Sequence, residues 1–386
     1  MKILHTADWH IGKLVNGVYM TEDQKYILEQ IVEIIKKEKI DVVIIAGDLY
    51  DRSIPPVEAV ELLDTYLSKI LLEIKVPVIA ISGNHDSADR LTFGNKILKD
   101  RGLYIEGKLK KEVEKVIIKY EGINYNFYLL PYLDPAEVRE GLEDSTIKTH
   151  DDVIKAMLKN IELNEEEINI AIAHGYILGT ESLEECDSER PLSIGGTEFI
   201  DVKHFEKFDY TALGHLHRSQ RVIYDKVRYS GSILKYSFSE VNHKKGVVIV
   251  DIGSEGQADY KLVELIPLRD MRIIKGELKE LLKPEVYENT NIEDYIHVVL
   301  TDDGELIDPM NKLREVYKNI LSLERQKDSK VNDREAKVTR ESIKIKSKLQ
   351  LFKEFYTTIT GLEFSKEKEE VVLEVLEEVN KLERAD

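Results

Sequence analysis

The chain has 386 residues and a formal net charge of −18, because 73 Asp and Glu residues outnumber 55 Lys and Arg residues. This length predicts two or three domains rather than one small core. No apolar run approaches the roughly 18 residues of a membrane span, and no secretory signal is visible, so a cytoplasmic protein without a membrane partner is expected. The single cysteine, Cys186, excludes an internal disulfide and a thiolate zinc site.

The first part of the chain alternates between strand and helix patterns. Apolar runs of strand length lie at Lys2–His5, Val42–Ala46 and Val76–Ile81. Helical spacing of apolar residues predicts three helices, at Gln24–Ile35, 57–71 and Ala88–Leu98. Further strands are expected at Val116–Tyr120, Tyr125–Leu130, Ile170–Ala173, Thr211–Leu213, Arg221–Tyr224, Val227–Tyr229 and Val247–Ile252. These elements predict an α/β (α+β) fold, a two-sheet sandwich with flanking helices.

Pro267 follows the last strand of this series and marks a predicted domain boundary. Residues 1–266 are expected to form the main domain and residues 267–324 a small α+β capping domain. Residues 325–386 then supply a basic linker and C-terminal helices. An apolar stripe on an acidic helix at 366–383 contains Val371, Val372, Val375, Leu376, Val379 and Leu382. Such a stripe favours docking on another protein, with packing on the chain itself as the alternative.

Polar side chains follow the predicted strands at the points where they end. Steps of about one β–α unit separate the first three groups, so these side chains can meet at one edge of a sheet, where α/β proteins bind ligands. The set comprises Asp8, His10, Asp48, Asn84, His85, His174, His215 and His217. A lone Asp or His at a strand end is more often a cap than a ligand, but a fold rarely needs so many histidines for packing.

The chemistry of this set points to metal binding. Oxygen and imidazole donors without a thiolate suit Mn²⁺, Fe²⁺ or Zn²⁺. Seven donors, all of the set except His85, are too many for one ion with an open position, and they suit two ions that share the carboxylate of Asp48. His85 is expected to point elsewhere and to protonate a leaving oxygen, with Asp86 orienting it.

Five short blocks carry a family resemblance. DWH at 8–10, GDLYD at 47–51, GNHD at 83–86, AHG at 173–175 and GHLH at 214–217 resemble the signature of calcineurin-like metallophosphoesterases. The resemblance implies a leaving-group acid at His85. It also implies two metal sites, the first formed by Asp8, His10, Asp48 and His217 and the second by Asp48, Asn84, His174 and His215.

Longer stretches at 2–13, 46–56 and 81–91 are similar to the SbcD family of bacterial nuclease subunits, and the similarity continues to 355–378. It implies a double-strand exonuclease and single-strand or hairpin endonuclease with two divalent ions, most simply Mn²⁺. It also implies a homodimer and a partner, an SbcC-like ATPase with a coiled coil that the C-terminal helices contact. Archaeal and eukaryotic relatives carry a second catalytic histidine where this chain has Asp51, so that role does not transfer and Asp51 is expected beside the ligands.

Two other functions fit the same motifs. A phosphatase or phosphodiesterase of small phosphoesters would use the same metals but would not need the C-terminal 120 residues. A non-catalytic scaffold would have lost ligands, and none is missing. Contacts to DNA are expected from Arg52, Arg90 and Arg218, although arginines are common on surfaces. The acidic composition argues mildly against binding to nucleic acid. Two divalent ions against two carboxylates would nevertheless give a local charge of about +2 where a phosphate would bind.

Overall fold

The computed structural model describes residues 1–180, 183–189 and 198–326, together with 353, 356, 364, 365, 368, 369, 371 and 372. The chain divides into a unit from Met1 to Arg325 and a second unit from Gln326 to Asp386. The predicted basic linker and nearly all of the predicted helix at 366–383 lie outside the described residues. The proposed domain boundary at Pro267 remains a prediction.

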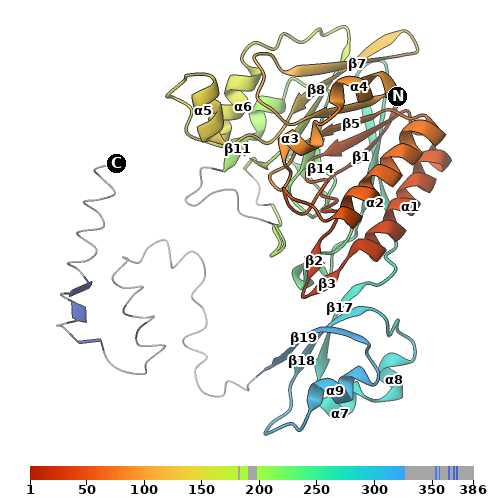
Figure 1. Cartoon of the computed structure of the whole chain (residues 1–386), viewed down its shortest axis with the longest axis vertical. Helices are drawn as coiled ribbons and strands as arrows, with labels where there is room; N and C mark the ends of the chain where they lie inside the picture. The colour runs from red at the N-terminus through yellow and green to blue at the C-terminus, as the bar shows by residue number, and fades with distance from the viewer. Residues whose placement is uncertain are drawn as a thin grey trace. The chain divides into compact units, whose positions relative to one another are not determined.

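The first unit contains all of the strands and nearly all of the helices in the described residues (Figure 1). The strands are β1 (Lys2–Thr6), β2 (Leu14–Val15), β3 (Val18–Tyr19), β4 (Val42–Ala46), β5 (Val78–Ile81), β6 (Leu103–Glu106), β7 (Glu114–Tyr120), β8 (Ile123–Leu130), β9 (Ile168–His174), β10 (Tyr176–Leu178), β11 (Phe199–Asp201), β12 (Tyr210–Gly214), β13 (Gln220–Val222), β14 (Tyr224–Tyr229), β15 (Gly246–Ile252), β16 (Ala258–Glu264), β17 (Met271–Gly276), β18 (Tyr295–Leu300) and β19 (Asn319–Arg325). The helices are α1 (Thr21–Glu38), α2 (Val57–Ser68), α3 (Ala88–Leu91), α4 (Asn95–Leu98), α5 (Pro135–Gly141), α6 (His150–Leu158), α7 (Leu278–Leu281), α8 (Pro284–Tyr287) and α9 (Pro309–Arg314).

Two six-stranded sheets form the main body of this unit. The first has the order β16-β15-β1-β4-β5-β6, and the second has the order β13-β14-β12-β9-β8-β7. Within the first sheet β1, β4, β5 and β6 are parallel, and within the second β8, β9, β12 and β14 are parallel. The predicted α/β two-sheet sandwich is confirmed, and the parallel central strands of each sheet end at a common edge.

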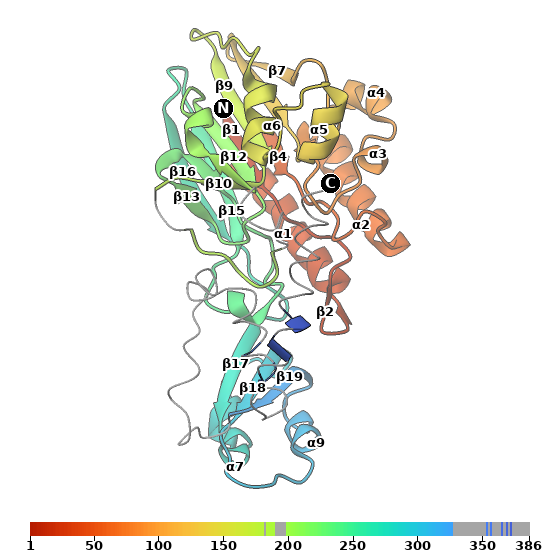
Figure 2. The ribbon, with the colours of Figure 1, turned by 90° about the vertical axis from the view of Figure 1, so that its left-hand side faces the viewer.

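The two faces of the first sheet enter different cores. Along β4, Val42 and Ile44 pack between the two sheets, whereas Val43 and Ile45 pack toward the helices. Burial on both faces explains why this strand reads as an unbroken β-branched run. The helices that cover the outer face are α1 and α2. Figure 2 shows α2 (orange) on one side of strands β1 and β4 and the green strand β13 of the second sheet on the other.

Two predicted elements are broken in the structure. The helix expected at Ala88–Leu98 is divided into α3 and α4, because Gly94 adopts a left-handed conformation (φ +75°) between them. The strand expected at Arg221–Tyr224 is interrupted at Ile223 (φ +55°), where β13 ends before β14. Periodicity alone could not locate either break, since apolar residues continue through both.

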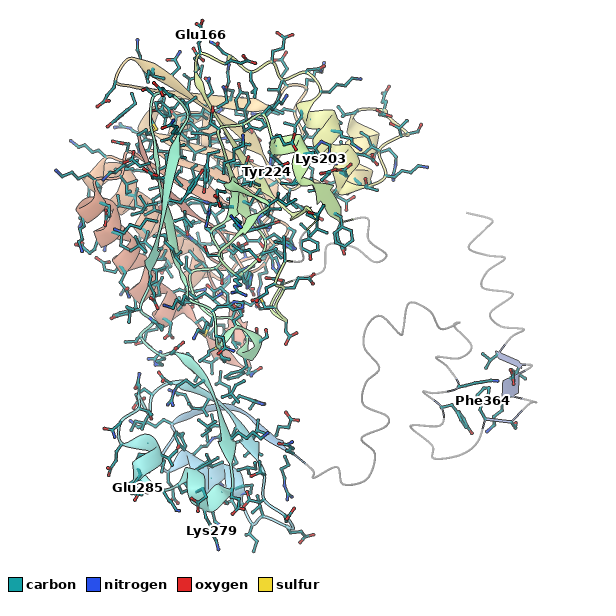
Figure 3. All side chains as sticks on the ribbon, turned by 180° about the vertical axis from the view of Figure 1, so that it is seen from behind. Glu166, Lys203, Tyr224, Lys279, Glu285 and Phe364 are labelled. Atoms are coloured by element: carbon teal, nitrogen blue, oxygen red, sulfur yellow. The ribbon has the colours of Figure 1, made fainter. Side chains whose placement is uncertain are left out.

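A separate parallel sheet, ordered β17-β18-β19, follows the main body of the unit. It has its own apolar core against α7 and α9, while side chains such as Lys279 and Glu285 project outward into solvent (Figure 3). Polar contacts join this sheet to the first turn of α1: the buried carboxylate of Asp23 accepts hydrogen bonds from Arg269 (2.8 Å) and from the Tyr295 hydroxyl (2.8 Å).

Candidate metal centre

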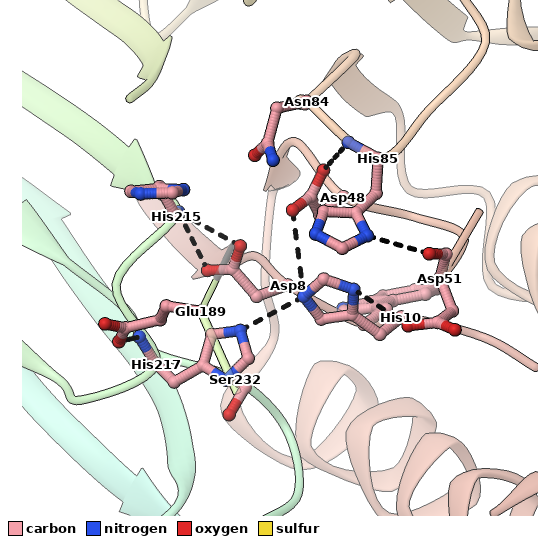
Figure 4. Close-up of polar contacts among 12 residues, drawn as sticks. Asp8, His10, Asp48, Asp51, Asn84, His85, Glu189, His215, His217 and Ser232 are labelled. Atoms are coloured by element: carbon pink, nitrogen blue, oxygen red, sulfur yellow. Dashed lines mark hydrogen bonds and ion pairs between the residues drawn. The ribbon is translucent and has the colours of Figure 1, made fainter. Parts of the chain in front are cut away.

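The eight side chains predicted at strand ends come together in space. Asp8 and His10 follow β1, Asp48 follows β4, and Asn84 and His85 follow β5. His174 ends β9, and His215 and His217 follow β12, so the two sheets contribute to one cluster (Figure 4). The two aspartates and four of the histidines are buried, whereas Asn84 and His85 are half-buried at the rim.

The backbone of this cluster is strained at four of the residues that carry its polar side chains. Asp8, His10 and Asp48 have φ values of 53°, 44° and 51°, and His215 has a φ of 110°. Left-handed φ values are uncommon for residues other than glycine, and such outliers gather at functional sites because surrounding structure must hold them. Here the strain turns consecutive strand ends toward one point.

Glycines next to these residues permit the close approach of neighbouring groups. A Cβ on Gly83 would lie 2.1 Å from Asp48 Oδ1, and a Cβ on Gly214 would lie 1.9 Å from the carbonyl oxygen of Ala46. Both distances are too short for any side chain. The glycines in the GNHD and GHLH blocks therefore give the carboxylate of Asp48 and the end of β4 the space they occupy.

One group of donors surrounds His10. Ligand atoms of Asp8, His10 and His217 lie within 4.8 Å of one another. The Nε2 atoms of His10 and His217 face each other at 3.1 Å, and both carboxylate oxygens of Asp8 accept from the backbone N–H of His215, at 3.0 and 3.1 Å. Two ring nitrogens cannot share this distance as two lone pairs, so a proton or a cation must lie between them.

The second group is built around His174. Its Nδ1 donates to the carbonyl oxygen of Ala46 (2.8 Å), which leaves Nε2 to face Asn84 Oδ1 at 3.0 Å. Ligand atoms of Asp8, Asp48 and His174 lie within 4.8 Å of one another, and the ring of His215 packs against that of His174, with centroids 5.6 Å apart.

Asp48 lies between the two groups. Its Oδ2 is 3.7 Å from His10 Nε2 and 3.5 Å from His174 Nε2, while Oδ1 accepts from the backbone N–H of His85 at 2.9 Å. One carboxylate oxygen therefore faces both groups. This is the position that the sequence predicts for a residue shared by two ions.

Burial and charge set the protonation of these groups. Burial raises the pKa of Asp8 to about 7, and burial holds the pKa values of His10 and His215 well below the usual range. Burial also opposes ionisation of Asp48, but His174 and His10 outweigh it and hold the pKa of Asp48 well below its usual range. Neutral imidazoles and an ionised aspartate are the forms that coordinate metal.

These observations fit divalent cations. The donors are buried nitrogen and oxygen atoms with no thiolate among the groups described above, and Nδ1 of His10 is buried without a hydrogen-bond partner. Imidazole and carboxylate donors together suit Mn²⁺, Fe²⁺ or Zn²⁺. One ion would be held by Asp8, His10 and His217, and the other by Asn84, His174 and His215. Asp48 would bind both ions.

His85 is positioned by a residue other than the predicted one. Its Nδ1 donates to the carbonyl oxygen of Asp51 at 2.7 Å, which leaves Nε2 available for proton transfer. The carboxylate of Asp86 instead accepts three backbone N–H groups, those of Leu49 (3.1 Å), Tyr50 (2.9 Å) and Gly83 (3.0 Å). The prediction that Asp86 orients His85 is therefore wrong, because those N–H groups take up its carboxylate and tie the loops after β4 and β5 together.

Asp51 lies beside the ligands, as expected. Its carboxylate pairs with Lys13 (2.8 Å) and approaches His10 Nδ1 (3.8 Å), so the same residue contacts a candidate ligand and, through its backbone, His85. Lys13 also lies 5.9 Å from the centre of the Tyr236 ring. Lys13 therefore adds a cation near the cluster, and this residue lies outside the five motif blocks.

The three arginines proposed for DNA contacts lie outside the buried cluster. Arg52 is 3.7 Å from Asp51, Arg218 pairs with Glu184, and Arg90 is exposed on α3. Their contacts to DNA remain a prediction. Burial and then the charges of Glu240 and Glu189 raise the pKa of the Cys186 thiol, which keeps the thiol from forming the reactive thiolate.

A buried polar network behind His217 was not predicted. Four side chains contact the backbone or the ring of this histidine: those of Ser188, Glu189, Glu240 and Lys245. They come from the segment 183–189, the turn at Phe238–Glu240 and the residue before β15. No motif marks them, and the only sequence signal is a glutamate and a lysine close to apolar strand residues.

Comparison with known proteins agrees with this geometry. A family model described as calcineurin-like phosphoesterase matches residues 1–219, and one described as type 5 capsule protein repressor C-terminal domain matches residues 267–360. The fold and the strand-end motifs thus define a calcineurin-like phosphoesterase, a hydrolase of phosphoester bonds. The SbcD component of the SbcCD nuclease of Staphylococcus epidermidis is 37% identical over 367 residues, which cover 95% of each chain. The chain belongs to the SbcD family of nuclease subunits, and the resemblance seen in the sequence is confirmed.

The metal-free protein should lose stability as pH rises from about 6.5 to 9.5. Burial alone lowers the pKa of His174, but Asp48 and Asp8 outweigh it and raise it to about 9. A raised histidine pKa contributes stability that is complete below pH 6.5 and lost as pH rises through about 9. Urea unfolding in EDTA at pH 6.5 and 9.5 measures the loss, and His174→Gln should flatten it. A pH dependence that His174→Gln leaves unchanged would contradict this origin.

Proposed function

We propose that this chain is a metal-dependent DNA nuclease, a double-strand exonuclease and single-strand or hairpin endonuclease that uses two divalent ions, Mn²⁺ by preference. The observation that carries the proposal is the cluster of seven nitrogen and oxygen donors, six of them buried, with half-buried Asn84 and His85 at its rim. When bound, two such ions would activate water and neutralise charge on a phosphoryl group. The nuclease name of the Staphylococcus epidermidis relative supports DNA as the substrate class.

The residues of the chain divide the remaining work. Asp48 fixes the spacing of the two metal sites because its Oδ2 faces both groups of donors. His85, held through Nδ1 by the Asp51 carbonyl, presents Nε2 to protonate the departing sugar oxygen. The second candidate, a hydrolase of small phosphoesters, has the same centre but gives no reason for similarity over 95% of the chain to a nuclease subunit.

An SbcC-like ATPase is the proposed partner, through residues 325–386. Support comes from the relative, whose name makes it one component of the SbcCD nuclease, and from the stripe that begins at Val371, whose side chain is exposed. The remainder of that stripe, apart from Val372, lies outside the described residues. The cytoplasmic location expected from the sequence is likewise part of the proposal.

A second copy of the chain is proposed to bind over α2, α3 and α4. A groove of about 1010 Å³ lies there, lined by apolar side chains that include Leu67, Leu71 and Leu98. Phe93 and Ile97 beside it are 85% and 76% exposed, which is unusual for large apolar side chains in one region. A symmetric dimer would bury this surface.

Removal of one ligand should abolish nuclease activity without unfolding the chain. Asn84→Ala deletes the oxygen that faces His174 at 3.0 Å and leaves the sheets intact. Labelled duplex and hairpin DNA and a small phosphodiester should be incubated with full-length protein in Mn²⁺ and in EDTA. The wild type should cleave DNA only with Mn²⁺, and the variant should bind fewer than two ions per chain. Two ions in the variant would contradict the assignment, and cleavage of only the small ester by the wild type would favour the second candidate.

His85→Ala should keep both ions and lose on the order of 10²–10⁴ in the rate of DNA cleavage, the usual share of general acid catalysis. A nitrophenyl phosphodiester should lose less, because its leaving group needs no proton. His297→Ala, in the separate β17-β18-β19 sheet, is the matched control and should cleave both substrates normally. Equal losses on both substrates in His85→Ala would rule out the general-acid role.

Phe93→Asp should convert a dimer to a monomer, because a carboxylate cannot be buried in an apolar interface without a partner. Light scattering during size-exclusion chromatography measures the mass. Ile307→Asp, at a residue 81% exposed in the separate small sheet region, is the control and should remain dimeric. A wild-type monomer at all concentrations, or a dimeric Phe93→Asp, would move the interface elsewhere.

A further inference from the structure

The second ring nitrogen of His217 meets a serine. Nδ1 of His217 lies 2.8 Å from Ser188 Oγ, while Nε2 faces the donors of Asp8 and His10. The affinity of His217 for an ion depends on which ring nitrogen carries the proton, because only an unprotonated nitrogen can coordinate an ion. Any role for Ser188 in preparing this ligand for metal rests on the proposed function.

The serine hydroxyl has only one hydrogen to donate. Ser188 Oγ lies 2.5 Å from Glu240 Oε1, and a carboxylate can only accept, so the hydroxyl hydrogen points to Glu240. Oγ must then accept from His217, which places the histidine proton on Nδ1. In the neutral imidazole, Nε2 is then left with its lone pair toward Asp8 and His10.

Glu240 is held in this role by a buried lysine. Its side chain is fully buried, and Lys245 Nζ contacts Oε2. The same ammonium donates to the carbonyl oxygen of His217 (2.7 Å) and to Ser232 Oγ (2.8 Å), so each of its three hydrogens has an acceptor. This ammonium is the cationic partner of the Glu240 carboxylate, and its contacts fix the position of that carboxylate behind Ser188.

The segment 183–189 also fixes the backbone of the histidine. Glu189 Oε1 accepts from the backbone N–H of His217 at 2.7 Å (Figure 4), and Cys186 Sγ donates to the same oxygen at 3.0 Å. The ring and the backbone of His217 are therefore held from one segment, 28 and 29 residues earlier in the sequence.

We propose that Ser188, Glu240 and Lys245 form a positioning relay that keeps the proton of His217 on Nδ1 and so presents Nε2 to the ion shared with Asp8 and His10. None of the three touches the reacting atoms. They act on the metal site through His217, as partners behind a histidine ligand orient it and raise its affinity for metal.

The test compares Ser188→Ala with Ser237→Ala in the full-length protein. Ser237 Oγ also donates to Glu240 Oε1 (3.3 Å), but its hydroxyl has no contact to His217 in the structure described. Titration with Mn²⁺ alone, followed by calorimetry, should show one of two sites weakened 10- to 100-fold in Ser188→Ala. Ser237→Ala should match the wild type within about twofold, and Ser188→Thr, which restores a hydroxyl, should recover most of the affinity.

A spectroscopic measurement reads the proton directly. Nitrogen NMR of histidine-labelled, metal-free wild type should show His217, assigned by its loss in His217→Gln, with its proton on Nδ1. Ser188→Ala should shift that signal toward a mixture of tautomers. A proton on Nε2 in the wild type, or unchanged Mn²⁺ affinity in Ser188→Ala, would overturn the relay alone. A wild type that binds no Mn²⁺ would overturn the proposed function and the relay together.

Discussion

The structure depends on the burial of two carboxylates among four imidazoles at the seam between two sheets. Asp8 and Asp48 are almost fully excluded from solvent; burial holds the pKa values of His10 and His215 low, whereas at His174 the two carboxylates outweigh burial and raise the pKa. Two buried carboxylates that have only the imidazole of His174 as a cationic partner are costly in such a setting. Divalent cations remove that cost, so the same arrangement that destabilises the metal-free protein gives the metal-bound protein its affinity.

The rest of the fold serves this arrangement. Parallel strands in each sheet bring loops from distant parts of the sequence to one edge, and strained residues such as Asp8 and Asp48 turn their side chains inward. Glycines such as Gly83 and Gly214 let the loops approach more closely than any side chain permits. Around this first layer, Asp86 ties two loops together through backbone N–H groups, and the Ser188–Glu240–Lys245 relay acts on a single ligand.

Much of this could be predicted from the sequence, because the relevant signals are local. Strand β4 was predicted to the residue, since burial on both faces leaves an unbroken apolar run. All seven proposed ligands lie at or directly after strand ends, and parallel strands bring such positions together whatever the rest of the fold. The structure places the seven side chains in one cluster, although their coordination of metal is still a proposal.

The remainder depends on contacts between distant residues that no local pattern records. His85 and Asp86 are adjacent, which suggested a contact, but the carboxylate turns toward Leu49 and Tyr50, and a backbone carbonyl takes its place beside His85. Ser188 and Glu240 are 52 residues apart and meet only behind His217. No sequence motif marks the backbone carbonyl of Asp51 or the side chain of Ser188, so only the three-dimensional structure identifies their roles.

Diffraction from crystals grown with Mn²⁺, collected near the manganese absorption edge, would locate the two ions and their ligands. Two anomalous peaks per chain are expected, about 3.5–4 Å apart, which is the usual spacing of paired catalytic ions. One peak should contact Asp8, His10 and His217, the other Asn84, His174 and His215, and Asp48 should contact both. A single peak, or a pair of peaks that does not share Asp48, would contradict the proposed two-metal site.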